Sequence, residues 1–173
     1  MRTIEDLLWL SDTPDGCPTP ASNPLTDPDA LQEAQLLDVR FDALRSTIAL
    51  IFELRVSLQF DEGNTGVLIA RAVRDIDWTV SKSPNARTAW NVVSSSVTRR
   101  GDAFEFRLGT WPGASMSLTA SNLEFYVGEV PGLDHIPNYV NDSEEKLIQQ
   151  LAGWSSELQV SHCAAVGSLH DES

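Results

Sequence analysis

Two aspartates four positions apart are the first candidates for chemistry in this chain. Asp38 and Asp42 alternate with apolar residues, so on a strand their carboxylates share one face, with Arg40 between them. Paired carboxylates perform general acid–base catalysis when their surroundings separate the two pKa values. The simpler interpretation is a row of cross-strand ion pairs, which we favour because the middle of the chain is rich in arginine. The candidate partners are Arg45, Arg55, Arg71 and Arg74.

Histidine and cysteine side chains near the C-terminus offer donor atoms for a metal ion. His162 is followed by Cys163, and His170 is followed by Asp171. Their spacing matches no established zinc pattern, and a structural zinc site needs four ligands. We therefore expect no metal site.

Cys163 is also a candidate nucleophile. Such a thiol needs a base and a third, orienting group, and the distant candidate base is His135. A small buried thiol is the simpler interpretation. The sequence contains no phosphate-binding glycine loop, dinucleotide fingerprint or serine elbow. An enzyme that uses Asp38 and Asp42, or these His and Cys residues, is therefore the function that we favour least. We expect no cofactor.

A group of aromatic and acidic residues in the last third of the chain predicts a contact surface. Trp111 stands beside Pro112 and Gly113 in an expected turn, and exposed tryptophan is favoured at binding hot spots. Acidic residues flank Tyr139. The predicted interaction surface consists of Trp111, Tyr139, Asp134, Asp142, Glu144 and Glu145.

The charge of the chain is strongly negative and lies at its two ends. The formal net charge is −13 over 173 residues. Residues 1–35 hold seven acidic residues and one basic residue, residues 36–130 hold eleven and ten, and residues 131–173 hold seven and one. An acidic surface repels nucleic acid and attracts basic partners. The simpler interpretation is a solvated surface that maintains solubility.

An alternating segment is the strongest structural signal in the sequence. Its apolar members are Ile48, Leu50, Phe52, Leu54, Val56, Leu58 and Phe60. Because strand side chains alternate between two faces, this pattern predicts a long, half-buried strand from Thr47 to Phe60.

Further alternating segments follow at hairpin spacing. They predict a strand from Val67 to Trp78 and a last strand after residue 157. They also predict that Ser121 and Asn122 form a tight connection between two strands. We predict a mainly β (α+β) fold. Its form is a single-domain antiparallel β-sandwich or curled meander of about seven or eight strands.

The N-terminal region, residues 1–35, is expected to form short helices and a proline-rich arm. Thr3 is the expected cap of the first helix, with Asp6 completing a capping box. Asp27 and Pro28 are expected to begin a second helical turn.

Residues 36–173 are expected to form one β-rich domain that includes an amphipathic helix. The helix is predicted over 143–157, with Asp142 as its cap and Glu145 as the capping-box partner. It is expected to pack on the sheet through an apolar face that includes Leu147 and Trp154.

The sequence also bears on where the protein acts. No basic segment followed by an apolar run opens the chain, and no apolar run approaches the roughly 18 residues of a membrane helix. We expect a cytoplasmic protein without membrane contacts, in which Cys17 and Cys163 stay reduced; a disulfide that joins the two ends of the chain is the alternative. Long alternating strands invite pairing, so a homodimer through an edge strand is a further expectation.

These observations favour a non-catalytic, acidic protein-interaction module as the function. An inhibitor or immunity-type protein that binds a basic partner, such as a nuclease-like toxin, has these properties. The alternative is a small-ligand-binding β protein, with an apolar pocket that is closed by the C-terminal helix and lined by Phe52, Phe106, Phe125 and tryptophans.

Overall fold

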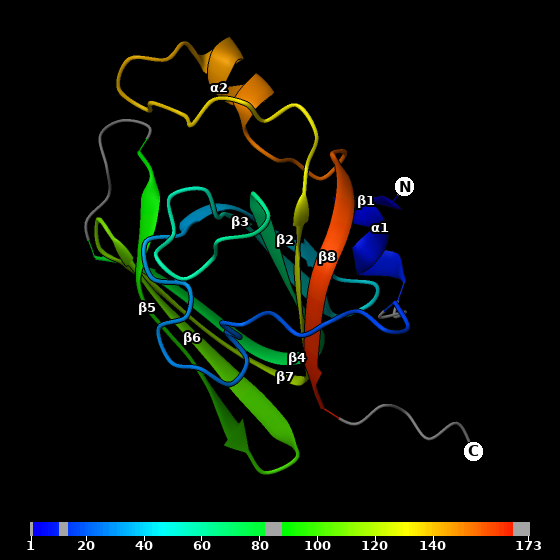
Figure 1. The fold of residues 1–173 in the computed structure, drawn as a ribbon. Coiled ribbons are helices and arrows are strands. Elements are labelled where there is room, and N and C mark those ends of the chain that lie inside the picture. Colours follow the sequence, from blue (N-terminus) through cyan, green and yellow to red (C-terminus); the bar gives the residue numbers. More distant parts are fainter. Residues whose placement is uncertain (1, 11–13, 82–87, 168–173) are drawn as a thin grey trace.

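The structure, a computed structural model, describes residues 2–10, 14–81 and 88–167 (Figure 1). Within these residues the strands are β1 (Arg2–Thr3), β2 (Gln35–Asp42), β3 (Thr47–Glu53), β4 (Thr65–Val80), β5 (Trp90–Arg100), β6 (Ala103–Trp111), β7 (Ala114–Glu129) and β8 (Glu157–Val166). The helices are α1 (Ile4–Trp9) and α2 (Glu144–Gln150). The expected mainly β fold with antiparallel strands is confirmed.

One curled sheet contains all eight described strands, in the order β1-β8-β7-β4-β3-β2-β5-β6. β7 also pairs with β6, so the strands from β7 to β6 close into a ring. β7 is long enough to pair with β6 along its first half and with β8 along its second, while β4 follows its other edge. The shortest pairing in the ring joins β2 and β5 through two residue pairs, Gln35 with Asn91 and Leu36 with Trp90.

β7 runs through Ser121 and Asn122 without a break, so the predicted tight connection there is wrong. Asn122 pairs with Arg71 of β4, and Leu123 pairs with Val166 of β8. Partners on both edges outweigh the local turn preference of serine and asparagine.

β3 is buried on both faces. Ile48, Leu50 and Phe52 enter the larger core, which side chains from all six strands of the ring share. Ala49 and Ile51 enter a second core, against the apolar face of α1. Because both faces are covered, this strand is apolar nearly throughout.

The second half of the predicted strand from Thr47 to Phe60 is wrong. β3 ends at Glu53, and the residues up to Phe60 form turns and irregular chain. The apolar residues of this stretch do not share one face: Leu54 joins the larger core and Phe60 packs against it, whereas Leu58 is 63% exposed.

A β-bulge interrupts β4 between Val73 and Asp75, just after Ala72, which has a φ of 52°. The pairing with β7 shifts at this point. Ser46 holds the bulge, because its hydroxyl donates to the Val73 carbonyl and its own carbonyl accepts from the Val73 amide, both at 2.9 Å. Beyond the bulge, the only described strand that pairs with β4 is β7, and Trp78 is 42% exposed.

The proline-rich arm packs against the ring, and Leu25 and Leu31 belong to the larger core. The expected helical turn beginning at Asp27 is wrong, and turns form there instead, because Asp29 and Glu33 have φ values of 58° and 65°. Their amides donate to carbonyl oxygens of β5: Asp29 to Ser95 at 2.8 Å, and Glu33 to Val92 at 2.9 Å.

Both described helices are short. Thr3 caps α1 as predicted, and both hydrogen bonds of the capping box with Asp6 are present. Ile4, Leu7 and Leu8 bury the apolar face of α1 in the second core. Neither described helix is long and apolar enough to cross a membrane.

Candidate functional site

A buried ion pair at the end of β3 organises the candidate site. The Glu53 side chain is 1% exposed and that of Arg55 is 13% exposed. Arg55 donates from Nε to Oε1 at 2.7 Å and from Nη2 to Oε2 at 2.6 Å, and its backbone amide donates to Oε1 at 2.8 Å. This bidentate geometry satisfies a carboxylate that would otherwise be costly to bury.

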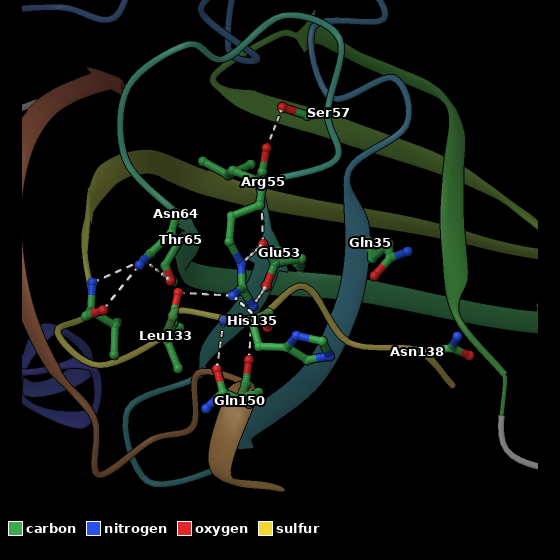
Figure 2. Close-up of polar contacts among 12 residues, drawn as sticks. Gln35, Glu53, Arg55, Ser57, Asn64, Thr65, Leu133, His135, Asn138 and Gln150 are labelled. Carbon is green, nitrogen blue, oxygen red and sulfur yellow. Dashed lines mark hydrogen bonds and ion pairs between the residues drawn. The ribbon is translucent and has the colours of Figure 1, made fainter. Parts of the chain in front are cut away.

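The guanidinium also fixes residues 131–151, which we call the α2 segment (Figure 2). Nη1 of Arg55 donates to the carbonyl oxygens of Leu133 at 3.0 Å and His135 at 2.9 Å, and Nη2 donates to that of Gln150 at 2.8 Å. Gln150 is the last residue of α2. Arg55 therefore satisfies a carbonyl that the end of a helix leaves without an internal partner.

α2 is shorter than the predicted helix over 143–157 and has a different cap. The Ser143 hydroxyl caps it by accepting from the Lys146 amide at 3.2 Å. The predicted cap, Asp142, instead accepts from the Asn138 amide at 2.8 Å and closes the preceding turn. Leu151 adopts an extended conformation with ψ of 141°, which ends the helix.

A cavity of about 360 Å³ lies between α2, β2 and the start of β5. Ile148 borders it and is 71% exposed, while Leu147 beside it is buried. The cavity is lined by Leu36, Leu37, Thr88, Ala89, Trp90, Tyr139, Glu144, Leu147, Ile148 and Leu151. Its wall is thus mostly apolar, with one carboxylate.

Tyr139 is a polar member of this lining. Its hydroxyl donates to Oε1 of Gln35 at 3.0 Å, which links the α2 segment to β2. Burial, and then the nearby charge of Glu53, raise the pKa of Tyr139 to about 12. The hydroxyl therefore stays protonated at neutral pH and acts as a hydrogen-bond donor.

The structure places four of the predicted acidic residues on the α2 segment. Asp142 forms a 3.1 Å ion pair with Lys146. The Asn138 amide, and then Lys146, hold the pKa of Asp142 below its usual value. Within the described part of the chain, the exposed residues Asp134, Glu144 and Glu145 form no ion pair.

Trp111 is the last residue of β6, before the turn into β7, and is 65% exposed. Its strand partner Asn91 follows Trp90, which lines the cavity. Trp90 also borders a second hollow of about 370 Å³, where its ring meets that of Trp78 at a centroid distance of 6.0 Å. The second hollow is lined by Leu36, Leu37, Asp38, Val39, Ile76, Trp78, Trp90 and Met116.

Asp38 and Asp42 lie on β2, but the predicted cross-strand pairs with arginines are wrong. Asp38 accepts from the indole N–H of Trp154 at 2.8 Å. Asp42 forms a 3.0 Å ion pair with Arg45 in the turn that follows β2. Burial raises the pKa of Asp42, but hydrogen bonds from Arg45 lower it by a larger amount. The net pKa lies below its usual value, so this carboxyl is a poor proton donor.

The predicted thiol and histidine candidates do not converge. Burial, and then the neighbouring Cys17 thiol, raise the pKa of Cys163 to about 12. His135 Nε2 lies 3.5 Å from Asp142, and His162 Nε2 lies 3.4 Å from Glu62. A thiol that is protonated at neutral pH is a poor nucleophile.

Of the metal ligands considered in the sequence, the structure describes His162 and Cys163. Among the described residues, no group of three or more His, Cys, Asp and Glu side chains is arranged to hold a metal ion. His170 and Asp171 lie outside the described residues.

Comparison with known proteins adds one structural match. No protein-family model and no curated protein matches the chain. The crystal structure of an uncharacterized protein from Neisseria gonorrhoeae is 14% identical and covers 54% of this chain and 90% of that chain, with a TM-score of 0.40.

Sequence reasoning missed most of the cavity lining. Leu36, Trp90 and Ile148 come from three distant parts of the chain. The exposed apolar face of the predicted helix was a usable signal for Ile148. No local pattern marks the other two, because the short pairing of β2 with β5 brings them together.

Proposed function

We propose that this protein is a non-catalytic interaction module that binds a basic segment of a partner protein at its α2 face. By the α2 face we mean the cavity beside α2 together with Asp134, Glu144 and Glu145. The proposal rests on one observation. The α2 segment both lines an apolar cavity and carries three acidic residues that form no ion pair with a described cation.

The chemistry of this surface favours a particular kind of ligand. The cavity suits an apolar side chain, and Glu144 contributes to its wall. Lysine or arginine beside that side chain would pair with the surrounding carboxylates. The net charge of −13 adds long-range attraction, which speeds association with a basic partner and makes it sensitive to salt.

A protein of this kind acts by covering its partner. An inhibitor or immunity-type protein needs a preformed, complementary surface and no catalytic group. Arg55 supplies the preformed geometry, because it ties both ends of the α2 segment to β3. Anchoring both ends of this segment limits its conformations before binding and so lowers the entropy lost on binding.

The proposal is tested by selecting peptides from a random displayed library on the immobilised protein at low salt. We expect enrichment of sequences in which an apolar residue stands among Lys and Arg. Ala89→Phe, which fills the cavity, should weaken a selected peptide by about tenfold or more. Glu145→Lys should weaken it by about three- to tenfold, mainly through slower association.

Asp102→Lys is the matched charge control, because Asp102 is 81% exposed on the β5–β6 turn, which Figure 1 places far from α2. It should leave the dissociation constant within about twofold, since exposed charges act weakly at a distance. Enrichment of peptides without basic residues would overturn the proposal. So would Ala89→Phe and Glu145→Lys variants that bind a selected peptide as tightly as the wild type does.

A small apolar ligand is the second candidate, and the cavity volume favours it. About 360 Å³ lies within the range of about 300–1,000 Å³ that small-molecule sites span. A lipid or aromatic compound that raises Tm in the wild type but not in Ala89→Phe would support this candidate. The Phe52, Phe106 and Phe125 lining expected from sequence is wrong for this cavity, since all three side chains are fully buried in the larger core.

A further inference from the structure

The two cysteines of the chain, 146 positions apart, meet where the proline-rich arm crosses β8. The Cys163 amide donates to the Pro18 carbonyl at 2.9 Å, which brings the two backbones to the separation of paired strands. The Cys163 thiol lies 3.9 Å from the Cys17 carbonyl oxygen. Both side chains pack in the second core.

This contact lies on the outer edge of β8. β1 covers the first residues of that edge through pairs with Glu157 and Leu158, and β7 covers the opposite edge. The arm covers the edge at Cys163, and in Figure 1 the blue arm passes beside β8. The juxtaposition is therefore part of the fold, because the arm satisfies a backbone donor of an edge strand.

The two thiols differ in their access to solvent. Cys17 is half-buried, whereas Cys163 is 4% exposed. An oxidant in solution therefore meets Cys17 first. Burial, and then the Cys17 thiol itself, raise the pKa of Cys163 to about 12, so Cys163 reacts in the second step and more slowly.

We propose that Cys17 and Cys163 form an intramolecular disulfide when the protein meets a low-molecular-weight disulfide such as oxidised glutathione. The Cys17 thiolate attacks one glutathione sulfur, forms a mixed disulfide and releases one glutathione thiolate. Cys163 then loses its proton to solvent and attacks the Cys17 sulfur, releasing the second glutathione. The protein loses two electrons and two protons, and oxidised glutathione becomes two molecules of reduced glutathione.

The cross-link joins the arm covalently to β8. It closes a loop across a sequence separation of 146 residues, and a long loop constrains the unfolded chain most. Since the same arm carries Leu25 and Leu31 into the larger core, oxidation strengthens an existing attachment. We expect the oxidised protein to melt about 5 °C or more above the reduced protein.

The test is incubation of the full chain in a glutathione redox buffer, followed by acid quenching and intact mass spectrometry. The expected product is a monomer lighter by about 2 Da, with a proteolytic fragment that joins Cys17 to Cys163. Its rate of formation should rise with pH between about pH 7 and pH 9, as the thiolate fraction of Cys163 grows.

Two single variants serve as controls. Cys163→Ser should keep one glutathione on Cys17, and Cys17→Ser should show neither an adduct nor a Tm increase. A wild-type protein that accumulates a glutathione adduct, or links two chains through Cys17, would overturn the proposal. The peptide selection at the α2 face does not use these thiols, so the two proposals fail independently.

Discussion

Arg55 and Arg71 play the same structural part at two places in the molecule. Each forms a bidentate pair with a glutamate on a strand, Glu53 and Glu124 respectively. Each also donates to carbonyl oxygens at the end of a helix: Arg55 to Gln150 of α2, and Arg71 to the last residues of α1. Neither helix has a basic residue in its last turn. The sheet thus supplies the positive charge that a helix C-terminus favours.

We predict that Arg55→Ala destabilises the fold by about 3–5 kcal/mol, because it leaves the buried carboxylate of Glu53 without a partner. Urea unfolding followed by tryptophan fluorescence measures this change. Arg74→Ala is the control and should cost less than about 1 kcal/mol, since its ion pair with Asp102 is exposed.

The double variant Glu53→Gln with Arg55→Met separates loss of a pair from loss of packing. It should recover part of the stability lost in Arg55→Ala, because no uncompensated charge remains. If Arg55→Ala and Arg74→Ala destabilised the protein equally, the buried pair would not have the role assigned to it.

A second residue-scale prediction concerns Ala72, whose φ of 52° is unfavourable for any residue with a Cβ atom. We expect Ala72→Gly to stabilise the protein by up to about 1 kcal/mol, the relief of strain exceeding the added entropy of the unfolded chain. Ala70→Gly, at a buried position that pairs with Ile48, should destabilise by about 1 kcal/mol or more. Thermal unfolding compares the two, and a loss of stability in Ala72→Gly would contradict the assigned conformation.

At the scale of elements, the two helices differ in how firmly they are held. α1 buries Ile4, Leu7 and Leu8, whereas α2 buries Leu147 alone. α2 is attached chiefly through the hydrogen bonds of Arg55 and Tyr139. A helix with little buried surface opens locally without unfolding the rest of the protein.

The capping residues test this difference. Thr3→Ala removes one side of the α1 capping box and should lower global stability by about 0.5–2 kcal/mol. Ser143→Ala should leave the global unfolding curve nearly unchanged but speed hydrogen exchange at Lys146 and Leu147. Thr3→Ser is the conservative control for α1. A global loss in Ser143→Ala equal to that in Thr3→Ala would show that α2 is part of the cooperative core.

At the scale of the whole molecule, the pH dependence of stability follows from the carboxylates. The pKa of Asp6 is lowered, first by the Thr3 amide, and that of Asp102 is lowered by Arg74. The pKa of Glu105 is lowered, first by Arg107. A folded-state pKa below the unfolded value stabilises the protein above the unfolded value, and this contribution is lost as pH falls through the folded-state value.

We therefore expect Tm to change little between about pH 7 and pH 5 and to fall steeply below about pH 4. Protonation also relieves repulsion among the excess negative charges, which opposes the fall and keeps the plateau broad. Calorimetry from pH 7 to pH 2 gives the curve, and Asp6→Asn should make its acidic limb shallower. A Tm that kept rising down to about pH 3 would show that relief of repulsion dominates.

Local patterns predicted the parts of the fold that depend on neighbours in sequence. The Thr3 cap with Asp6 needs contacts three residues apart, so a sequence motif is sufficient. The alternation after residue 157 likewise predicted β8. The same reasoning failed for residues after Glu53, because the Glu53–Arg55 pair and the turn that follows override an alternation that continues in the sequence.

The candidate site shows the same division. Asp134, Glu144 and Glu145 were predicted from sequence, because a local excess of negative charge is visible there. Their relation to Leu36 and Trp90 was not, because the cavity depends on contacts between residues far apart in the chain. Trp111 was predicted to be exposed and is exposed, yet its pairing with Asn91, next to the cavity residue Trp90, depends on how the strands pair.

The sequence by itself determined the β class, the cap of α1 and the uneven distribution of charge, since periodicity, capping and charge are set by neighbouring residues. The tertiary structure alone decided the closure of the ring by β7, the burial of Glu53 with Arg55 and the meeting of Cys17 with Cys163. Each of these depends on segments distant in sequence, including the α2 segment that covers the local Glu53–Arg55 pair, and packing and desolvation choose among many partners that local preference treats alike.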